Sequence, residues 1–190
     1  MKKTLFPLLF LLCPSLGFAH EAGHGGGFMD GLSHPVFGLD HFLAMISVGI
    51  LSAQMGRRAR WIIPTTFVGA MLVGGMLGMN DLELPYVELG IVISVLALGV
   101  AIAAKWKFPM PLNMLLIGCF AIFHGHAHGT EMPGSEPTLY ACGFLSGAAG
   151  IHLAGLLVGA VAGGLRHGTQ FLRYLGAGIA GIGFHLLYLM

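Results

Sequence analysis

Histidine and aspartate stand together in an otherwise apolar part of the chain, the segment HPVFGLDH at residues 34–41. Imidazole nitrogen and carboxylate oxygen are ligands that nickel, cobalt and zinc accept. On a helix, His34 and His41 would be seven residues apart on one face, with Asp40 about 100° round from His41. Asp40 alone could be a structural hydrogen-bond anchor, but its place beside two histidines favours a metal-binding cluster of all three.

A second segment, FHGHAHGTE at residues 123–131, puts three imidazoles and a carboxylate within eight residues. Alternating histidines broken by glycine and alanine make a poor ordinary helix and favour a flexible chelating strip. The alternative, a solvated polar loop end, is strongest for His126. We expect His124, His128 and Glu131 to be metal ligands, with His126 beside them.

Three further histidines are candidate ligands. His152 lies near the middle of an apolar segment, where a histidine without a partner is costly, so it is either an inner relay ligand or a satisfied core residue. His185 lies near the end of the last apolar segment and could reach the same site. His20, with His24, stands in the segment HEAGHGGG, which is either a metal-capturing arm or an untethered polar tail.

The elements that position these residues are predicted to be transmembrane helices. Hydrophobic residues make up 56% of the 190 and charged residues 9%, against about a quarter charged in soluble domains. The apolar runs approach the roughly 20 residues that cross a bilayer as a helix, and they lack the two-residue alternation of a barrel. We therefore expect an all-α membrane protein, a compact six-helix bundle with spans near residues 32–55, 61–79, 87–104, 112–123, 138–164 and 171–190.

The first nineteen residues resemble a secretory signal peptide. Lys2 and Lys3 form a basic start, an apolar stretch follows, and residues 17–19 offer a small-x-small cleavage site. The alternative is an uncleaved anchor helix, which Pro14 and the short apolar stretch disfavour. Cleavage would leave a His/Gly-rich segment at 20–31 and a six-span domain at 32–190.

Charges are sorted between the loops, and this sorting predicts the orientation. Lysine and arginine favour the cytoplasmic side. The acids other than Asp40 fall in the opposite set of connections, so the mature amino and carboxyl termini are predicted to be periplasmic, and both histidine segments to lie in the periplasmic half of a bacterial inner membrane. The basic residues after the signal are Arg57, Arg58, Arg60, Lys105, Lys107, Arg166 and Arg173, and the sorted acids are Glu21, Asp30, Asp81, Glu83, Glu88, Glu131 and Glu136.

Glycine is abundant, at 31 residues, and it recurs at four-residue spacing. Small residues let membrane helices approach closely without a hydrophobic driving force between them. The series Gly155, Gly159 and Gly163 therefore predicts tight helix packing, with a gating hinge as the alternative.

The two histidine segments, together with the signal peptide and six spans, resemble the HupE/UreJ family of nickel and cobalt permeases. The resemblance covers nearly the whole mature chain. It implies that the metal is handled by His34, Asp40 and His41 in the first segment and by His124, His128 and Glu131 in the second. A related permease group has H-x4-D-H in a membrane helix, whereas this chain has H-x5-D-H.

Transport of Ni²⁺ or Co²⁺ as substrate, with no prosthetic group and no enzymatic activity, is the predicted function. No GxxxxGK[ST] loop occurs, so we expect the protein to bind no nucleotide. We also expect it to bind no nucleic acid. The expected partners are the metal ion and the lipid bilayer, and the sequence leaves a homo-oligomer open. The alternatives are an intramembrane zinc-dependent hydrolase, with three ligands and an open position for water, and a metal sensor or maturation partner without transport.

Overall fold

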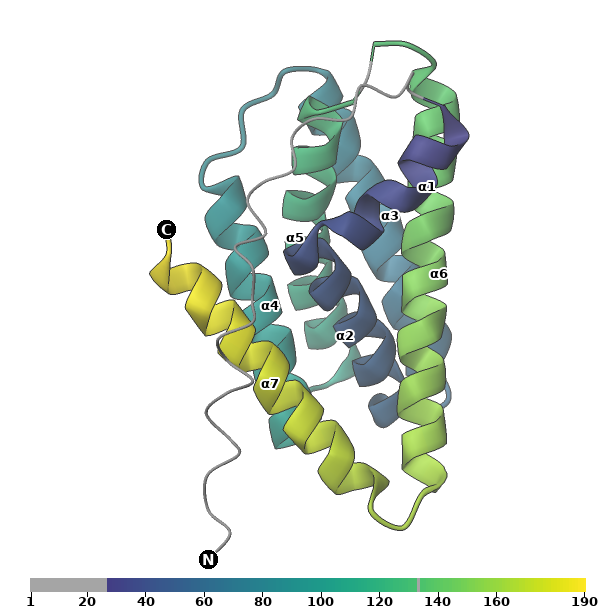
Figure 1. The fold of residues 1–190 in the computed structure, drawn as a ribbon, viewed down its shortest axis with the longest axis vertical. Helices are drawn as coiled ribbons and strands as arrows, with labels where there is room; N and C mark the ends of the chain where they lie inside the picture. Colours follow the sequence, from purple (N-terminus) through teal and green to yellow (C-terminus); the bar gives the residue numbers. More distant parts are fainter. Residues whose placement is uncertain (1–26, 133) are drawn as a thin grey trace, which may run out of the picture.

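The computed structural model describes residues 27–132 and 134–190, and the regular secondary structure of this part of the chain consists of α-helices (Figure 1). The expected signal peptide at 1–19 and the candidate ligands His20 and His24 lie outside the described residues. No strand occurs among the described ones, which confirms the all-α class. The helices are α1 (Phe28–Phe37), α2 (Leu39–Met55), α3 (Ala59–Met79), α4 (Val87–Ala104), α5 (Met110–Thr130), α6 (Pro137–Gly164) and α7 (Gly168–Tyr188).

The first expected span is not one straight helix, so the prediction of a single continuous helix over 32–55 is wrong. Helix α1 begins earlier, at Phe28, and meets α2 at an angle of 85°. The break lies at Gly38, whose backbone is extended, with φ −77° and ψ 107°. The next turn restarts as a helix because the amide of Phe42 bonds the Gly38 carbonyl at 2.8 Å, and Asp40 places a negative charge at the new N-terminus.

Four of the described helices, α3, α4, α5 and α6, are long and apolar enough to cross a membrane, and the bent α1–α2 pair passes the same test as one broken span. The chain is therefore a multi-pass membrane protein with four to five candidate spans. Helix α7 is long enough to cross a membrane, with 21 residues, but it is not apolar enough. Its five glycines and the polar residues of its first turns lower its mean hydropathy. A sixth span stays a prediction.

Close backbone contacts at glycine join the helices into three groups. Helices α1 and α2 pack on α6, α3 packs on α5, and α4 packs on α7. A methyl group at Gly49 of α2 would overlap the His152 carbonyl of α6, one at Gly125 of α5 would overlap the Met71 carbonyl of α3, and one at Gly99 of α4 would overlap the backbone of Ala180 in α7. The expected tight packing is confirmed at Gly155 and Gly159, which face α2, whereas Gly163 faces open space.

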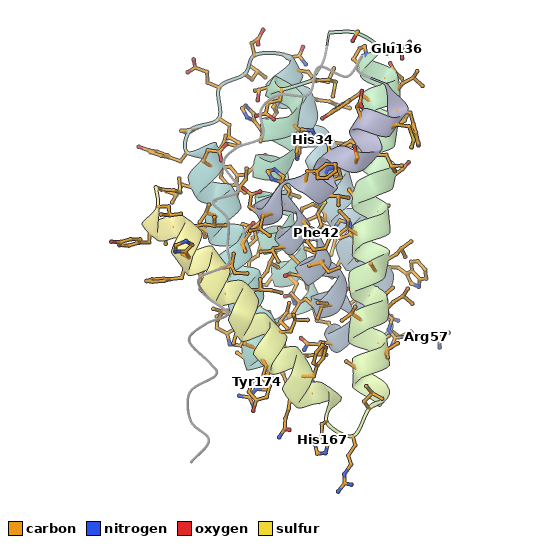
Figure 2. All side chains as sticks on the ribbon, viewed as in Figure 1. His34, Phe42, Arg57, Glu136, His167 and Tyr174 are labelled. Carbon is orange, nitrogen blue, oxygen red and sulfur yellow. The ribbon has the colours of Figure 1, made fainter. Side chains whose placement is uncertain are left out.

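Acidic and basic connections lie at opposite ends of the bundle. The α3–α4 and α5–α6 connections are at the upper end of Figure 1, and the α2–α3, α4–α5 and α6–α7 connections are at the lower end. Figure 2 labels one member of each set, Glu136 above and Arg57 below. The acidic and basic residues that alternate between connections along the sequence are therefore separated at the two ends of the folded bundle.

Candidate metal centre

Histidines from both sequence segments meet inside the acidic half of the bundle. The His128 ring of α5 lies edge-on between the rings of His34 in α1 and His41 in α2, with ring centroids 4.8 and 4.3 Å away. The His41 ring also meets the ring of His124, one turn deeper in α5, at 4.7 Å. Residues 83 to 94 positions apart in sequence therefore form one cluster, of which His34 is labelled in Figure 2.

Helix α5 continues through its histidines to Thr130, so the expected flexible strip is wrong. Glycine is tolerated here because Gly125 and Gly129 lie against the backbone of α3, where a side chain would not fit. The continuous helix puts His124 and His128 on one face, four residues apart. His126 lies on the other side, where its Nε2 is 2.8 Å from the Leu82 carbonyl oxygen and ties α5 to the α3–α4 connection.

The bend at Gly38, rather than a shared helix face, brings the first segment together. His34 approaches His128 from α1 and His41 approaches it from α2, so the expectation that these two histidines share a face of one helix is wrong. The glycine matters because the extended turn lets the chain change direction between the two histidines.

Asp40 holds the His41 ring. Its Oδ1 accepts a hydrogen bond from the His41 amide and lies 2.7 Å from His41 Nδ1. Because a carboxylate only accepts, Nδ1 carries the hydrogen and Nε2 keeps its lone pair. His41 Nε2 is buried and has no hydrogen-bond partner among the described residues. A carboxylate behind an imidazole is the arrangement that orients histidine ligands toward metals.

Ser94 of α4 orients the His124 ring, a role that was not among the sequence-based predictions. Its hydroxyl donates to the Ile91 carbonyl at 2.6 Å, so the 2.9 Å contact with His124 Nε2 uses the ring N–H as donor. The lone pair is then on His124 Nδ1, which is buried without a hydrogen-bond partner among the described residues. A single serine in an apolar segment does not indicate from sequence alone that its hydroxyl will contact a histidine of another helix.

Carboxylate oxygen joins the cluster through Glu131. One ligand atom each from His34, His128 and Glu131 lies within 4.8 Å of the others. Glu131 is exposed and His128 is buried, and neither nitrogen of His128 has a hydrogen-bond partner in the described part of the chain. At the full 4.8 Å separation, a metal held about 2.0–2.2 Å from each atom would need these atoms to come roughly 1 Å closer to one another. The candidate ligand atoms are therefore imidazole nitrogens and a carboxylate oxygen, and they lie toward the end of the bundle that carries the acidic connections.

Comparison with known proteins identifies the family of this chain. The family model described as HupE / UreJ protein matches residues 8–186. The chain belongs to the HupE/UreJ family. The protein HupE of Rhizobium leguminosarum bv. viciae is similar, with 39% identity over 186 residues that cover 97% of each chain. No solved structure matches.

Three candidate histidines of this HupE/UreJ protein lie apart from the cluster. Besides His126, described above, His152 of α6 is buried behind the Phe67 ring, which lies 5.0 Å from it and 5.7 Å from His124. The Ala148 backbone is near, but neither His152 nitrogen makes a hydrogen bond of ordinary geometry with a described residue. His185 is exposed on α7, and no ring contact among the described residues links it to the others.

Proposed function

We propose that this HupE/UreJ protein transports a divalent transition-metal cation, nickel or cobalt, across the bacterial inner membrane. The observation that carries the proposal is the convergence of both histidine segments on one cluster, in which His41, His124 and His128 each have a buried ring nitrogen without a hydrogen-bond partner among the described residues. Burying a polar group without a hydrogen bond is costly, and more so in a bilayer. A bound cation would offset this cost at His41, His124 and His128 together.

The cluster offers a graded entry for a hydrated cation. Acidic residues at the same end of the bundle raise the local cation concentration. Glu131 is exposed, His34 is half-buried, and His124 is fully buried. A cation would lose its water stepwise in this order, to Glu131, His34 and His128 first and then to His41 and His124, with Asp40 balancing the charge.

The donor set suits nickel and cobalt. Imidazole nitrogen with some carboxylate accepts both ions, and equilibrium affinity alone rises from cobalt to nickel to copper, so the selection among metals would come from geometry. The remaining parts of the proposal are six spans after a cleaved signal peptide, periplasmic termini, and His152, His185 and His20 as accessory ligands.

Sealed liposomes containing the purified protein test the proposal. We expect Ni²⁺ or Co²⁺ supplied outside to accumulate inside at a rate that protein-free liposomes do not match. Cleavage of lipid or peptide substrates with no accumulation would instead indicate a zinc-dependent hydrolase. Metal binding without accumulation or cleavage would indicate a sensor or maturation partner.

Acidification should slow uptake. Metal binds the neutral imidazole, so protons compete for the same nitrogen, and unperturbed histidine titrates near pH ~6.5. Lowering the pH from 8 to 5 on both sides of the liposome membrane should therefore reduce the initial rate of uptake. Equal pH on the two sides removes any contribution from a proton gradient. A flat profile would contradict histidine as the entry ligand.

A further inference from the structure

Buried polar atoms without partners extend beyond the cluster. Within the described residues, the side chains with such atoms are the cluster histidines His41, His124 and His128 and three deeper residues, Ser47, Gln54 and His152. Ser47 is fully buried, and its hydroxyl has no hydrogen-bond partner in the part of the chain that the structure describes. This is unusual because a serine in an apolar helix ordinarily satisfies its hydroxyl on a carbonyl of the preceding turn.

Ser52 of the same helix shows the ordinary arrangement. It is also fully buried, but its hydroxyl donates to the Gly49 carbonyl at 2.7 Å. Ser94, Thr65 and Thr66 bond backbone carbonyls of their own helices in the same way. The free hydroxyl of Ser47 therefore sets this residue apart from other hydroxyl residues of the bundle.

Ser47 and Gln54 continue a line that begins at Asp40. The three residues are spaced by seven along α2, and seven residues turn the helix by about 20° less than two full turns, so all three lie on one face. Each step is roughly 10 Å along the axis. The line runs from the cluster to the last turn of α2, next to the connection that carries Arg57 and Arg58.

Helix α2 is inside the bundle rather than at its surface. It contacts α6, α4, α3, α1 and α7. Ser47 is fully buried, and so is Ala44, while Leu51 is 4% exposed. The line of Asp40, Ser47 and Gln54 therefore faces other helices, where a cation would meet protein groups and not lipid.

We propose that the Ser47 hydroxyl and the Gln54 side-chain carbonyl are inner coordination positions for the cation on its way from the cluster to the basic end of the bundle. This inference rests on the proposed function. Neutral oxygens hold nickel and cobalt more weakly than imidazole does. A path conducts only if its sites bind strongly enough to admit the ion and weakly enough to release it. Ligands of falling affinity along α2 meet both conditions.

The alternative path leads past Phe67 to His152. The Phe67 ring is fully buried and contacts the rings of both His124 and His152, so a packed aromatic side chain fills the direct line between them. A cation that follows the line of Asp40, Ser47 and Gln54 on α2 does not have to pass an aromatic ring first, because Asp40 is itself part of the cluster.

Uptake by the variants Ser47→Ala and Gln54→Met, measured in liposomes at limiting Ni²⁺, tests the inference. Each change removes the oxygen at nearly constant volume. We expect each to lower the initial rate by about fivefold, the effect of losing one neutral polar contact. Ni²⁺ alone should raise the melting temperature of both variants as much as that of the wild-type protein, because the outer cluster is intact.

Ser52→Ala is the matched control, since it makes the same change on the same helix at a hydroxyl that is already satisfied. Wild-type rates in Ser47→Ala and Gln54→Met would overturn the inference while leaving transport standing. An equal loss of uptake rate in Ser47→Ala and Ser52→Ala would also overturn it, because it would indicate a general effect on packing. A loss of uptake rate in His152→Leu alone would overturn it as well, because it would indicate the path past Phe67. Absence of accumulation by the wild-type protein would instead contradict the proposed function itself.

Discussion

Replacing His128 with leucine should abolish nickel uptake without destabilising the metal-free protein. His128 is in ring contact with both His34 and His41, and its two nitrogens are buried without partners in the described structure. Loss of residues that only orient a ligand costs about 10–100-fold in metal affinity, and loss of the ligand should cost at least as much. Leucine is similar in volume and removes an unsatisfied buried group, so the free energy of unfolding should be unchanged or higher by up to about 1 kcal/mol.

Thermal unfolding in detergent and liposome uptake separate these two effects. The wild-type melting temperature should rise with added Ni²⁺, whereas that of His128→Leu should not respond. His167→Leu is the control, because His167 is exposed at the opposite end of the bundle (Figure 2) and its side chain makes no capping hydrogen bond to α7. A variant that loses stability without metal and keeps its Ni²⁺ response would show that His128 is a packing residue.

Replacing Gly125 with alanine should destabilise the bundle and impair the site together. The added methyl group would overlap the Met71 carbonyl of α3, and backbone cannot move aside as a flexible side chain can. Overpacking of this kind costs roughly 1–3 kcal/mol. For a chain of this size, each kcal/mol lowers the melting temperature by roughly 2–4 °C. Because His124 and Gly125 are neighbours on α5, separation of α3 from α5 would also move the ligand.

Gly118 provides a control on the same two helices. A methyl group there would make only ordinary contacts, 3.8 Å from Ala70 and 3.9 Å from Thr66. Gly118→Ala should therefore be neutral or stabilising, because alanine favours a helix over glycine by up to about 1 kcal/mol. Equal melting temperatures for Gly118→Ala and Gly125→Ala would refute the role of close backbone contact in holding α3 to α5.

The sequence was sufficient to predict the helical membrane class and most helix positions. Composition and run length decide these features, and α4 matches the expected range of 87–104. The break at Gly38 could not be predicted, because a glycine in an apolar run is compatible with both a continuous helix and a bend. Continuation of α5 through its histidines was missed for a related reason. Glycine weakens an isolated helix, but its contact with α3 favours the helix here.

The candidate site was predictable to the extent that it depends on residue type. His34, Asp40, His41, His124, His128 and Glu131 were proposed as one group, and the structure brings them together. The hydrogen bond of Ser94 to His124 and the separation of His126 from the cluster depend on which helix faces which. That information lies in tertiary packing, and one sequence does not contain it.

The grouping of helices through glycine divides the ligands between two bodies. His34 and His41 belong to the helices that pack on α6, whereas His124 and His128 belong to α5, which packs on α3 and is followed directly by Glu131. Side chains, including the imidazoles themselves, fill the interface between the group of α1, α2 and α6 and the group of α3 and α5. Any rocking of one body against the other must change the distance between the two halves of the ligand set. Under the proposed function, such a motion would change the cation's coordination at the same time as the shape of the bundle.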